Sequence, residues 1–351
     1  MVGRPVCHPH HWPILGAELV ALLASARLSN ALTFSENVAV GTYSSTVPFY
    51  YSDMQSLIER LGELRLGFQT ANEGRGDLIA PGEKKWEAWI RGFGGGLKID
   101  NGASRNFDQD YGGFQTGFDR MLGPLGSGDL YLGGFAGYIH SSRDFHDESV
   151  SRTDAFSLGT YATWIHPSGW YVDLVGKYSY MSNSFTARTS GGAASNGDYD
   201  ISTCGGSIEF GKRVELVNHR LFIEPKAQLA GAWESGMDYG TSDGLRVHGE
   251  QQTSLQGTLG GRIGMHFDFR SGRALEPYVQ GEVVEEFLTN NRVQTGADSF
   301  AIHLSGTTAW AGAGLTLKAG RSIYLYSEYD YATGDHLELT WGMNVGFRLQ
   351  W

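Results

Sequence analysis

The chain has 351 residues, a formal net charge of -11, 13% aromatic residues and 50 glycines, but only 19% charged residues. The acidic balance argues against nucleic acid as a partner, and no run of about 18 apolar residues, as a membrane-spanning helix needs, follows residue 35. Abundant glycine and aromatic residues in alternating sequence are instead typical of a transmembrane β-barrel, in which each strand carries only a weak signal.

Residues 1–47 are interpreted as an N-terminal segment, either a signal sequence or the remnant of an exported region. Pro13 to Leu28 is moderately apolar, and Ser29-Asn30-Ala31 matches the small-x-small pattern of signal cleavage. Glu18 interrupts the apolar run, which favours the alternative of an exported region. Two cysteines, Cys7 and Cys204, cannot form a disulfide framework, and Cys204 has no Cys/His cluster near it. His8, His10 and His11 could suggest metal binding, but histidines in such an N-terminal segment seldom bind a metal, so the sequence predicts no metal site or cofactor.

A helix is predicted from Ser52 to Gly67, with a capping-box pattern at Ser52 and Gln55 and a glycine at its end. Apolar residues recur at helical spacing, with charges on the other side. The helix either covers an ordinary core or lies inside a polar barrel lumen. Residues 48–85 are therefore expected to be a lumenal helix and linker, and the helix residues expected to contact the lumen are Leu57, Glu59, Arg60, Leu61, Glu63 and Arg65.

From Trp86 onward the pattern is typical of strands, and residues 86–351 are predicted to form an all-β outer-membrane barrel. An even number of strands with short turns at one end and longer polar loops at the other is expected of such barrels. Twelve antiparallel strands are predicted, at 86–99, 109–122, 129–141, 152–166, 170–187, 199–213, 220–235, 250–269, 275–289, 299–318, 321–331 and 336–351.

The last predicted strand alternates without exception between apolar residues, from Leu337 to Trp351, and polar residues or glycine, from Glu338 to Gln350. Such alternation predicts one face toward lipid and one toward the lumen. Because a sheet in lipid must close to pair its edge groups, this strand is expected to pair with the first. Glycines at Gly92, Gly94, Gly95 and Gly96 would allow the first strand to bend.

Charged residues on the polar faces are expected to line a hydrated lumen and to pair there. They are Arg91, Arg120, Asp173, Lys177, Glu224, Lys226, Glu282, Glu328, Asp330 and Arg348. Two adjacent pairs, His146-Asp147 and Asp335-His336, could serve a surface hydrolase, but neighbours on a strand point to opposite faces, which is poor geometry for a general base. A stand-alone porin or adhesin is the other alternative.

Several segments together resemble the β-domain of monomeric autotransporters, the type V secretion family. They are Thr46-Val47-Pro48-Phe49-Tyr50, Leu61-Gly62-Glu63-Leu64-Arg65, Trp89-Ile90-Arg91-Gly92, the run Asp129 to Tyr138, Glu276-Pro277-Tyr278, Tyr329-Asp330-Tyr331 and Gly346 to Trp351. The resemblance covers residues 46–351 and is specific only in combination.

This resemblance implies a monomeric twelve-stranded outer-membrane barrel that is threaded by a helix and exports or anchors an N-terminal passenger at the cell surface. It implies outer-membrane lipid, the barrel-assembly machinery, periplasmic chaperones and the chain's own passenger segment as partners, and no enzymatic activity. It also implies that the closing residues Phe347, Leu349 and Trp351 form the signal for barrel assembly. The chain departs from some relatives because residues 48–85 contain no Asn-Asn pair, which those relatives use for self-cleavage.

Overall fold

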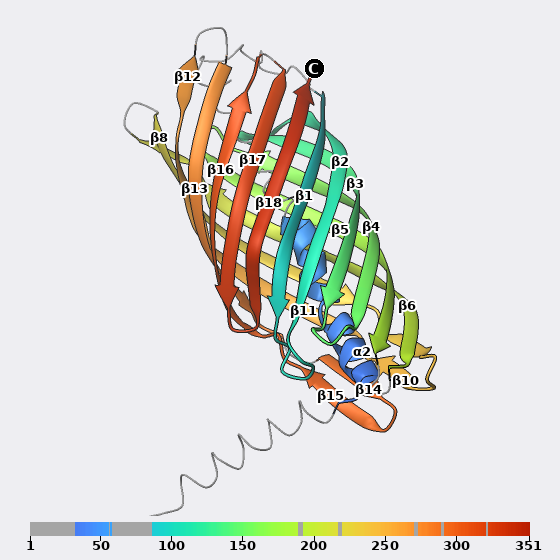
Figure 1. Cartoon of the computed structure of the whole chain (residues 1–351). Helices are drawn as coiled ribbons and strands as arrows, with labels where there is room; N and C mark the ends of the chain where they lie inside the picture. The colour runs from blue at the N-terminus through green and yellow to red at the C-terminus, as the bar shows by residue number, and fades with distance from the viewer. Residues whose placement is uncertain are drawn as a thin grey trace, which may run out of the picture.

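The computed structural model describes residues 32–55, 57, 86–188, 192–216, 220–269, 273–288, 291–320 and 322–351. They form a closed antiparallel barrel of 12 strands around a helix (Figure 1), which confirms the predicted fold class. The barrel strands are β1 (Trp86–Ile99), β2 (Phe107–Leu125), β3 (Gly128–Asp144), β4 (Val150–Ile165), β5 (Trp170–Arg188), β6 (Ala194–Lys212), β8 (Leu221–Glu234), β11 (Gln252–Met265), β13 (Arg273–Glu286), β16 (Gly306–Lys318), β17 (Ile323–Gly334) and β18 (Leu337–Gln350).

The two faces of each strand differ as the alternation predicts. On β5, Leu174 and Tyr178 are exposed on the outer face, whereas Asp173 and Lys177 are buried on the inner face. Apolar side chains stand outward because lipid replaces water there, and polar side chains turn inward where they can pair. The exposed tryptophans Trp86, Trp170, Trp233, Trp341 and Trp351 lie toward the strand ends, where a membrane barrel carries its aromatic girdles.

The barrel closes where β1 pairs with β18, from Glu87 opposite Gln350 to Ile99 opposite Leu337. Beyond the last ladder pair, the amide of Trp86 donates to the carbonyl of Trp351 at 3.1 Å, and the amide of Trp351 donates back at 3.0 Å. The predicted pairing of the first and last strands is therefore confirmed.

The perfect alternation expected along β18 is wrong at one point. The register shifts between Gly96 and Leu97, in the glycine-rich part of β1. Beyond this bulge Leu339 faces inward with 1% of its surface exposed, while Glu338, expected to face the lumen, points outward and lies 3.7 Å from Lys98. One extra residue in a strand moves all later side chains to the opposite face.

Two of the long loops contain strands of their own. The β8–β11 loop forms β9 (Met237–Gly240) and β10 (Arg246–Gly249), and the β13–β16 loop forms β14 (Asn291–Thr295) and β15 (Asp298–Ile302). They pair as one four-stranded sheet in the order β15-β14-β10-β9, called the loop sheet below. The prediction of one strand over 299–318 is therefore wrong: it divides between β15 and β16.

The opposite rim of the barrel has short connections, such as the turns between β2 and β3 and between β4 and β5. Near it lie two short strands, β7 (Val214–Leu216), paired with β8, and β12 (Phe267–Phe269), paired with β13. Long loops at one rim and tight turns at the other match the expected asymmetry of an outer-membrane barrel. The rim with the tight turns, where Trp86 and Trp351 meet, is called the turn rim below.

The helix begins earlier than the sequence pattern predicts. α2 (Phe34–Ser44) starts with Thr33 as N-cap in a capping box with Glu36, and residues 46–55 and 57 are also helical. Ser52 is not an N-cap but an internal residue, whose hydroxyl donates to the carbonyl of Pro48 at 3.1 Å. The rest of the predicted helix, Ile58 to Gly67, lies outside the described residues. Within the described parts of the chain, no helix has both the length and the apolarity to cross a membrane.

Candidate functional site: the lumenal helix and its seat in the barrel

α2 lies next to the loop sheet, and the chain that follows it runs into the barrel (Figure 1). At this end Glu36 accepts a hydrogen bond from Thr295 of β14 at 2.9 Å, and Ser35 donates to Asp243 of the β9–β10 turn at 2.8 Å. The inner face of the loop sheet supplies the buried Val247, Val293 and Ile302 to the same core as Val38 and Val40 of α2. The loop sheet therefore covers the helix with apolar contacts and anchors it with polar ones.

Polar side chains from the barrel wall and from the β1–β2 loop surround the break between α2 and residues 46–55. Asn101 donates to Ser44 at 2.6 Å, Arg143 of β3 donates to Ser45, and Gln252 of β11 donates to the carbonyl of Tyr43 at 3.0 Å. Ser45 is the C-cap of α2, so the carbonyls and hydroxyls at this break need partners. The wall and the β1–β2 loop provide them from several directions.

Glu234 of β8 is the acceptor at the centre of these polar side chains and is fully buried. One carboxylate oxygen accepts from Thr46 at 2.7 Å and from Gln252 at 2.9 Å, and the other accepts from Thr203 of β6 at 2.9 Å. A buried carboxylate is tolerated only with such donors. Glu234 thus joins β6, β8, β11 and the helical segment in one network.

Deeper in the lumen the helical segment is held by an ion pair. The Lys177 ammonium of β5 lies 2.5 Å from the carboxylate of Asp53, and neither side chain has more than 3% of its surface exposed. Ser157 of β4 donates to the same carboxylate at 2.7 Å. Lys177 also donates to the carbonyl of Tyr50 at 2.9 Å and stands 4.0 Å from the centre of its ring.

Below this pair Leu57 is fully buried in an apolar cluster. Its neighbours in that cluster come from the inner faces of β1 to β5, among them Trp89, Tyr131, Tyr161 and Tyr171. This placement agrees with the expectation that Leu57 contacts the barrel from inside. The other predicted helix residues, Glu59, Arg60, Leu61, Glu63 and Arg65, lie outside the described residues.

α2 packs against β5 and, to a lesser extent, against β4 on one side of the lumen. On the other side a cavity of about 110 Å³ remains between residues of the helical segment, such as Tyr51, and wall residues such as Glu286 and Trp310. This space is large enough for a few water molecules. A second extended polypeptide would not fit beside the helix in this part of the lumen.

The structure places the predicted lumen charges other than Arg120 on the inner face of the barrel, nearly all of them buried. Several are paired: Glu224 with Arg262 at 2.9 Å, Lys226 with Glu282 at 2.6 Å and with Glu209 at 3.6 Å, and Arg348 with Glu87 at 3.2 Å. Gln280 donates to both Glu328 and Asp330, and Arg91 donates to Gln115. Asp173 is 1% exposed.

The prediction for Arg120 is wrong. Arg120 is paired across the ladder with Trp86 on the outer face, and its guanidinium lies 4.8 Å from the centre of that ring. The neighbouring Asp119 takes the inner position and accepts a hydrogen bond from Tyr161 at 2.6 Å. The alternation of β2 therefore has the opposite phase to the one assumed from sequence.

Leu349 and Trp351 stand exposed on the outer face at the turn rim, and Phe347 precedes them on the same face. The two His/Asp pairs considered for a hydrolase do not form. His146 approaches Asp108 at 3.5 Å rather than Asp147, and His336 contacts the carbonyl of Asp100 rather than Asp335.

Sequence reasoning missed several of the residues that hold the helix. Glu234 could have been found, because it continues the inward series Phe222, Glu224, Lys226 and Gln228 along β8. Arg143 could not, since the predicted strand ended two residues before it. Asp53 gave no signal, because a single acidic residue at a helix start is common.

Three comparisons bear on the identity of the barrel. The model of the family "Autotransporter beta-domain" matches residues 88–330. The chain is 35% identical to the pertactin autotransporter of Bordetella bronchiseptica over 91% of this chain and 33% of the relative, and 31% identical to the BrkA autotransporter of Bordetella pertussis over 92% of this chain and 30% of the relative.

The chain therefore spans about a third of the length of these curated relatives. Among solved structures, the β-domain of the Bordetella autotransporter BrkA superimposes with a TM-score of 0.66 at 28% identity, covering 76% of this chain and 99% of that one. Since the family model matches well over half of the chain, and the barrel, its closure and its lumenal helix are present, the chain belongs to the autotransporter β-domain family of bacterial outer-membrane translocator barrels.

Proposed function

We propose that this chain inserts into the outer membrane and delivers an N-terminal passenger to the cell surface, where the lumenal helix then anchors it and closes the pore. The lumenal helical chain would begin at α2, Phe34–Ser44, and not at residue 48 as expected from the sequence. The chain before α2 would be the passenger side, and residues 86–351 would be the translocator barrel. The loops and the loop sheet would face the outside of the cell, and the turn rim would face the periplasm.

The observation that carries this proposal is the path of the chain. The helical chain begins beside the loop sheet and runs into the barrel, while β1 begins at the opposite rim. The described part of the chain therefore runs from the loop sheet at Phe34 into the lumen as far as Leu57, which lies in the same cluster as Trp89 of β1. On this proposal, a passenger joined to the N-terminal side of α2 would lie at the loop rim, on the far side of the membrane from the periplasm.

The tightness of the seat supports the order of events. With the helix docked, the cavity beside it is about 110 Å³, which leaves no room for passenger chain to pass. Export would therefore precede docking of Asp53 on Lys177 and of Thr46 on Glu234. The docked helix is the final state.

The partners follow from this role. The exposed apolar side chains on the outer face of the barrel would contact outer-membrane lipid. Periplasmic chaperones and the barrel-assembly machinery would bind the chain before insertion. That machinery would recognise the end of the last strand at Phe347, Leu349 and Trp351. The barrel would act as a monomer and without enzymatic activity, since its buried charges serve to hold the helix and pair across the wall.

The test is the location of a peptide tag placed immediately before Leu32. In intact cells that express the full chain, we expect the tag to be accessible to antibody and to added protease. The same tag inserted at Ser168, in a turn of the turn rim, serves as the matched control and should become accessible only after the outer membrane is opened. A tag before Leu32 that stays protected in intact cells, with the barrel folded, would contradict the proposal.

A further inference from the structure

Near the turn rim, one arginine crosses the inner wall of the barrel. Arg213, directly after β6, makes two parallel hydrogen bonds of 2.8 Å to the carboxylate of Glu276 on β13. Its backbone amide donates to the carbonyl of Gly169, in the β4–β5 turn, at 2.9 Å. The arginine therefore links the β4–β5 turn to β13 past β8 and β11, which lie between them in the sheet.

The space for Arg213 to cross the wall depends on a glycine, Gly264 of β11. A Cβ at Gly264 of β11 would lie 2.5 Å from the ring of Phe222 of β8, so Phe222 can lie flat across the wall only because residue 264 is glycine. The Arg213 guanidinium in turn stacks 3.7 Å from the centre of the Phe222 ring. We call Arg213 and Glu276 the rim strap.

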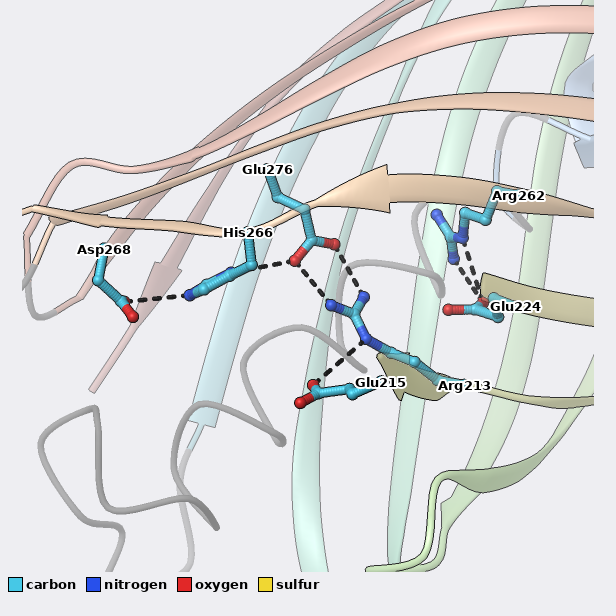
Figure 2. Close-up of polar contacts among 7 residues, drawn as sticks. All are labelled: Arg213, Glu215, Glu224, Arg262, His266, Asp268 and Glu276. Carbon is cyan, nitrogen blue, oxygen red and sulfur yellow. Dashed lines mark hydrogen bonds and ion pairs between the residues drawn. The ribbon is translucent and has the colours of Figure 1, made fainter. Parts of the chain in front are cut away.

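A histidine fastens the rim strap to the next hairpin, as Figure 2 shows. His266 lies after the end of β11, with Nδ1 3.2 Å from Glu276 and Nε2 3.0 Å from Asp268 of β12. Both ring nitrogens thus face carboxylate oxygens. Only the protonated imidazolium can donate to both, because a neutral ring turns one lone pair toward a carboxylate.

The other groups around His266 are compatible with a proton there. The cation near the His266 ring is Arg213, and its charge is paired with Glu276 at 2.8 Å. Glu215 lies 3.9 Å from Arg213, and Phe222 of β8 is apolar. The Arg262–Glu224 pair stands next along the wall (Figure 2). The hydrogen bond to Glu276 raises the pKa of His266 above its ordinary value, with Asp268 adding to the effect.

We propose that His266 is a proton-operated latch on the rim strap. When protonated, His266 connects the rim strap to β12 and stabilises the turn rim between β6 and β13. When it loses its proton, one of its two carboxylate contacts is lost and the rim loosens. Because the folded-state pKa is raised, the latch is fully closed below the ordinary histidine pKa of about 6.5 and opens as the pH rises through the higher folded-state value.

Hydrogen exchange of the full chain in detergent micelles, corrected for the intrinsic effect of pH, tests the latch. The informative amides are those of Arg213, bonded to Gly169, and of His266, bonded to the carbonyl of Arg220 at 2.7 Å. Between pH 5.5 and 8.5 we expect their protection to fall by a factor on the order of ten, because one hydrogen bond to a charged group is lost. His266→Gln should show the low protection at both pH values, and His266→Lys, which keeps its charge, should remain protected at pH 8.5.

His166→Gln is the matched control, because the His166 ring lies at the same rim but contacts Ser168, at 2.6 Å, and the ring of Trp164 rather than the carboxylates of Glu276 and Asp268. It should keep the wild-type pH profile. Electrophoretic mobility of unheated samples, which separates folded from unfolded barrel, verifies that each variant is folded. A folded His266→Gln variant with the wild-type pH profile, or a wild-type protein without one, would overturn the proposal.

Discussion

The Lys177 ammonium and the Asp53 carboxylate meet at 2.5 Å inside the barrel, each almost completely buried. Lys177 belongs to the barrel wall and Asp53 to the helical segment, so this ion pair forms only when the segment is docked in the lumen.

Replacing Lys177 by methionine should release the helical segment. Removal of one partner leaves a buried charge uncompensated, which costs about 3–5 kcal/mol. We expect a lower midpoint of thermal unfolding and a larger single-channel conductance in planar bilayers, since the lumen would open. Lys98→Met is the control, because Lys98 pairs with Glu338 on the outer face, and it should leave both quantities unchanged.

The double variant Asp53→Leu/Lys177→Met separates a lost charge from a lost contact. Replacing both members of a buried pair by apolar residues is often neutral or stabilising. Most of the conductance increase should therefore disappear in the double variant. A single variant with wild-type conductance would show that the pair does not hold the helix.

Gly95 should be essential for closing the barrel. A Cβ there would lie 2.6 Å from the Tyr111 hydroxyl of β2. It would also lie 2.8 Å from the backbone carbonyl oxygen of Trp341, on the other side of the β1–β18 pairing that closes the barrel, called the seam below. Gly95→Ala should cost about 1–3 kcal/mol through overpacking and reduce the fraction of barrel that refolds in detergent. Gly92→Ala should refold like the wild type, because the nearest atom to its Cβ is 3.9 Å away. Equal refolding of both variants would refute this account of the seam.

The loop sheet should protect α2 from solvent. Val293 of β14 is fully buried against the core that includes α2, whereas its neighbour Gln294 is on the exposed face of the same strand. Val293→Asp would bury an unpaired charge, so we expect faster amide exchange along residues 34–44. Gln294→Asp adds the same charge toward solvent and should not change it. If both variants exchange alike, the sheet does not cover the helix.

Removing the side chain of Trp351 should separate assembly in cells from folding in detergent. The residue contributes two backbone hydrogen bonds to Trp86 and its ring stands exposed on the outer face. If the assembly machinery reads this ring, Trp351→Ala keeps the backbone bonds and refolds in detergent but gives little barrel in cell envelopes. Trp341→Ala, exposed on the same strand, should give normal amounts of barrel in cells. Normal assembly of Trp351→Ala would argue against the signal.

The barrel was predictable because lipid enforces its pattern. Along β18 every outward position from Trp341 to Trp351 is apolar, and the lumen takes the polar remainder. The bulge was not predictable, because its extra residue is Thr340 of β18, opposite Gly96 and Leu97, and the alternation of the sequence runs through that point unbroken. Arg120 was misplaced because the glycine-rich sequence of β2 does not fix the phase of its alternation.

α2 escaped prediction although its capping box, Thr33 to Glu36, is visible in the sequence. A helix enclosed on every side has no amphipathic face, so Val38, Ala39 and Val40 follow one another without helical spacing. The loop sheet was missed since its strands have only 4–5 residues, too few for alternation to stand out. The pairing of the β8–β11 loop with the β13–β16 loop could not be predicted from the sequence.

The seam between Trp86 and Trp351 also has a kinetic consequence. Every other pair of adjacent barrel strands is also consecutive along the chain, if the short strands in the connections are left out of the count. The contacts within those pairs therefore have low sequence separation. The Glu87–Arg348 pair at the seam joins residues 261 positions apart. Contacts of such high order form slowly because a long chain must first lose its freedom. Until they form, β1 and β18 are two open sheet edges, and the lifetime of that open sheet sets the period in which the barrel is most exposed to aggregation.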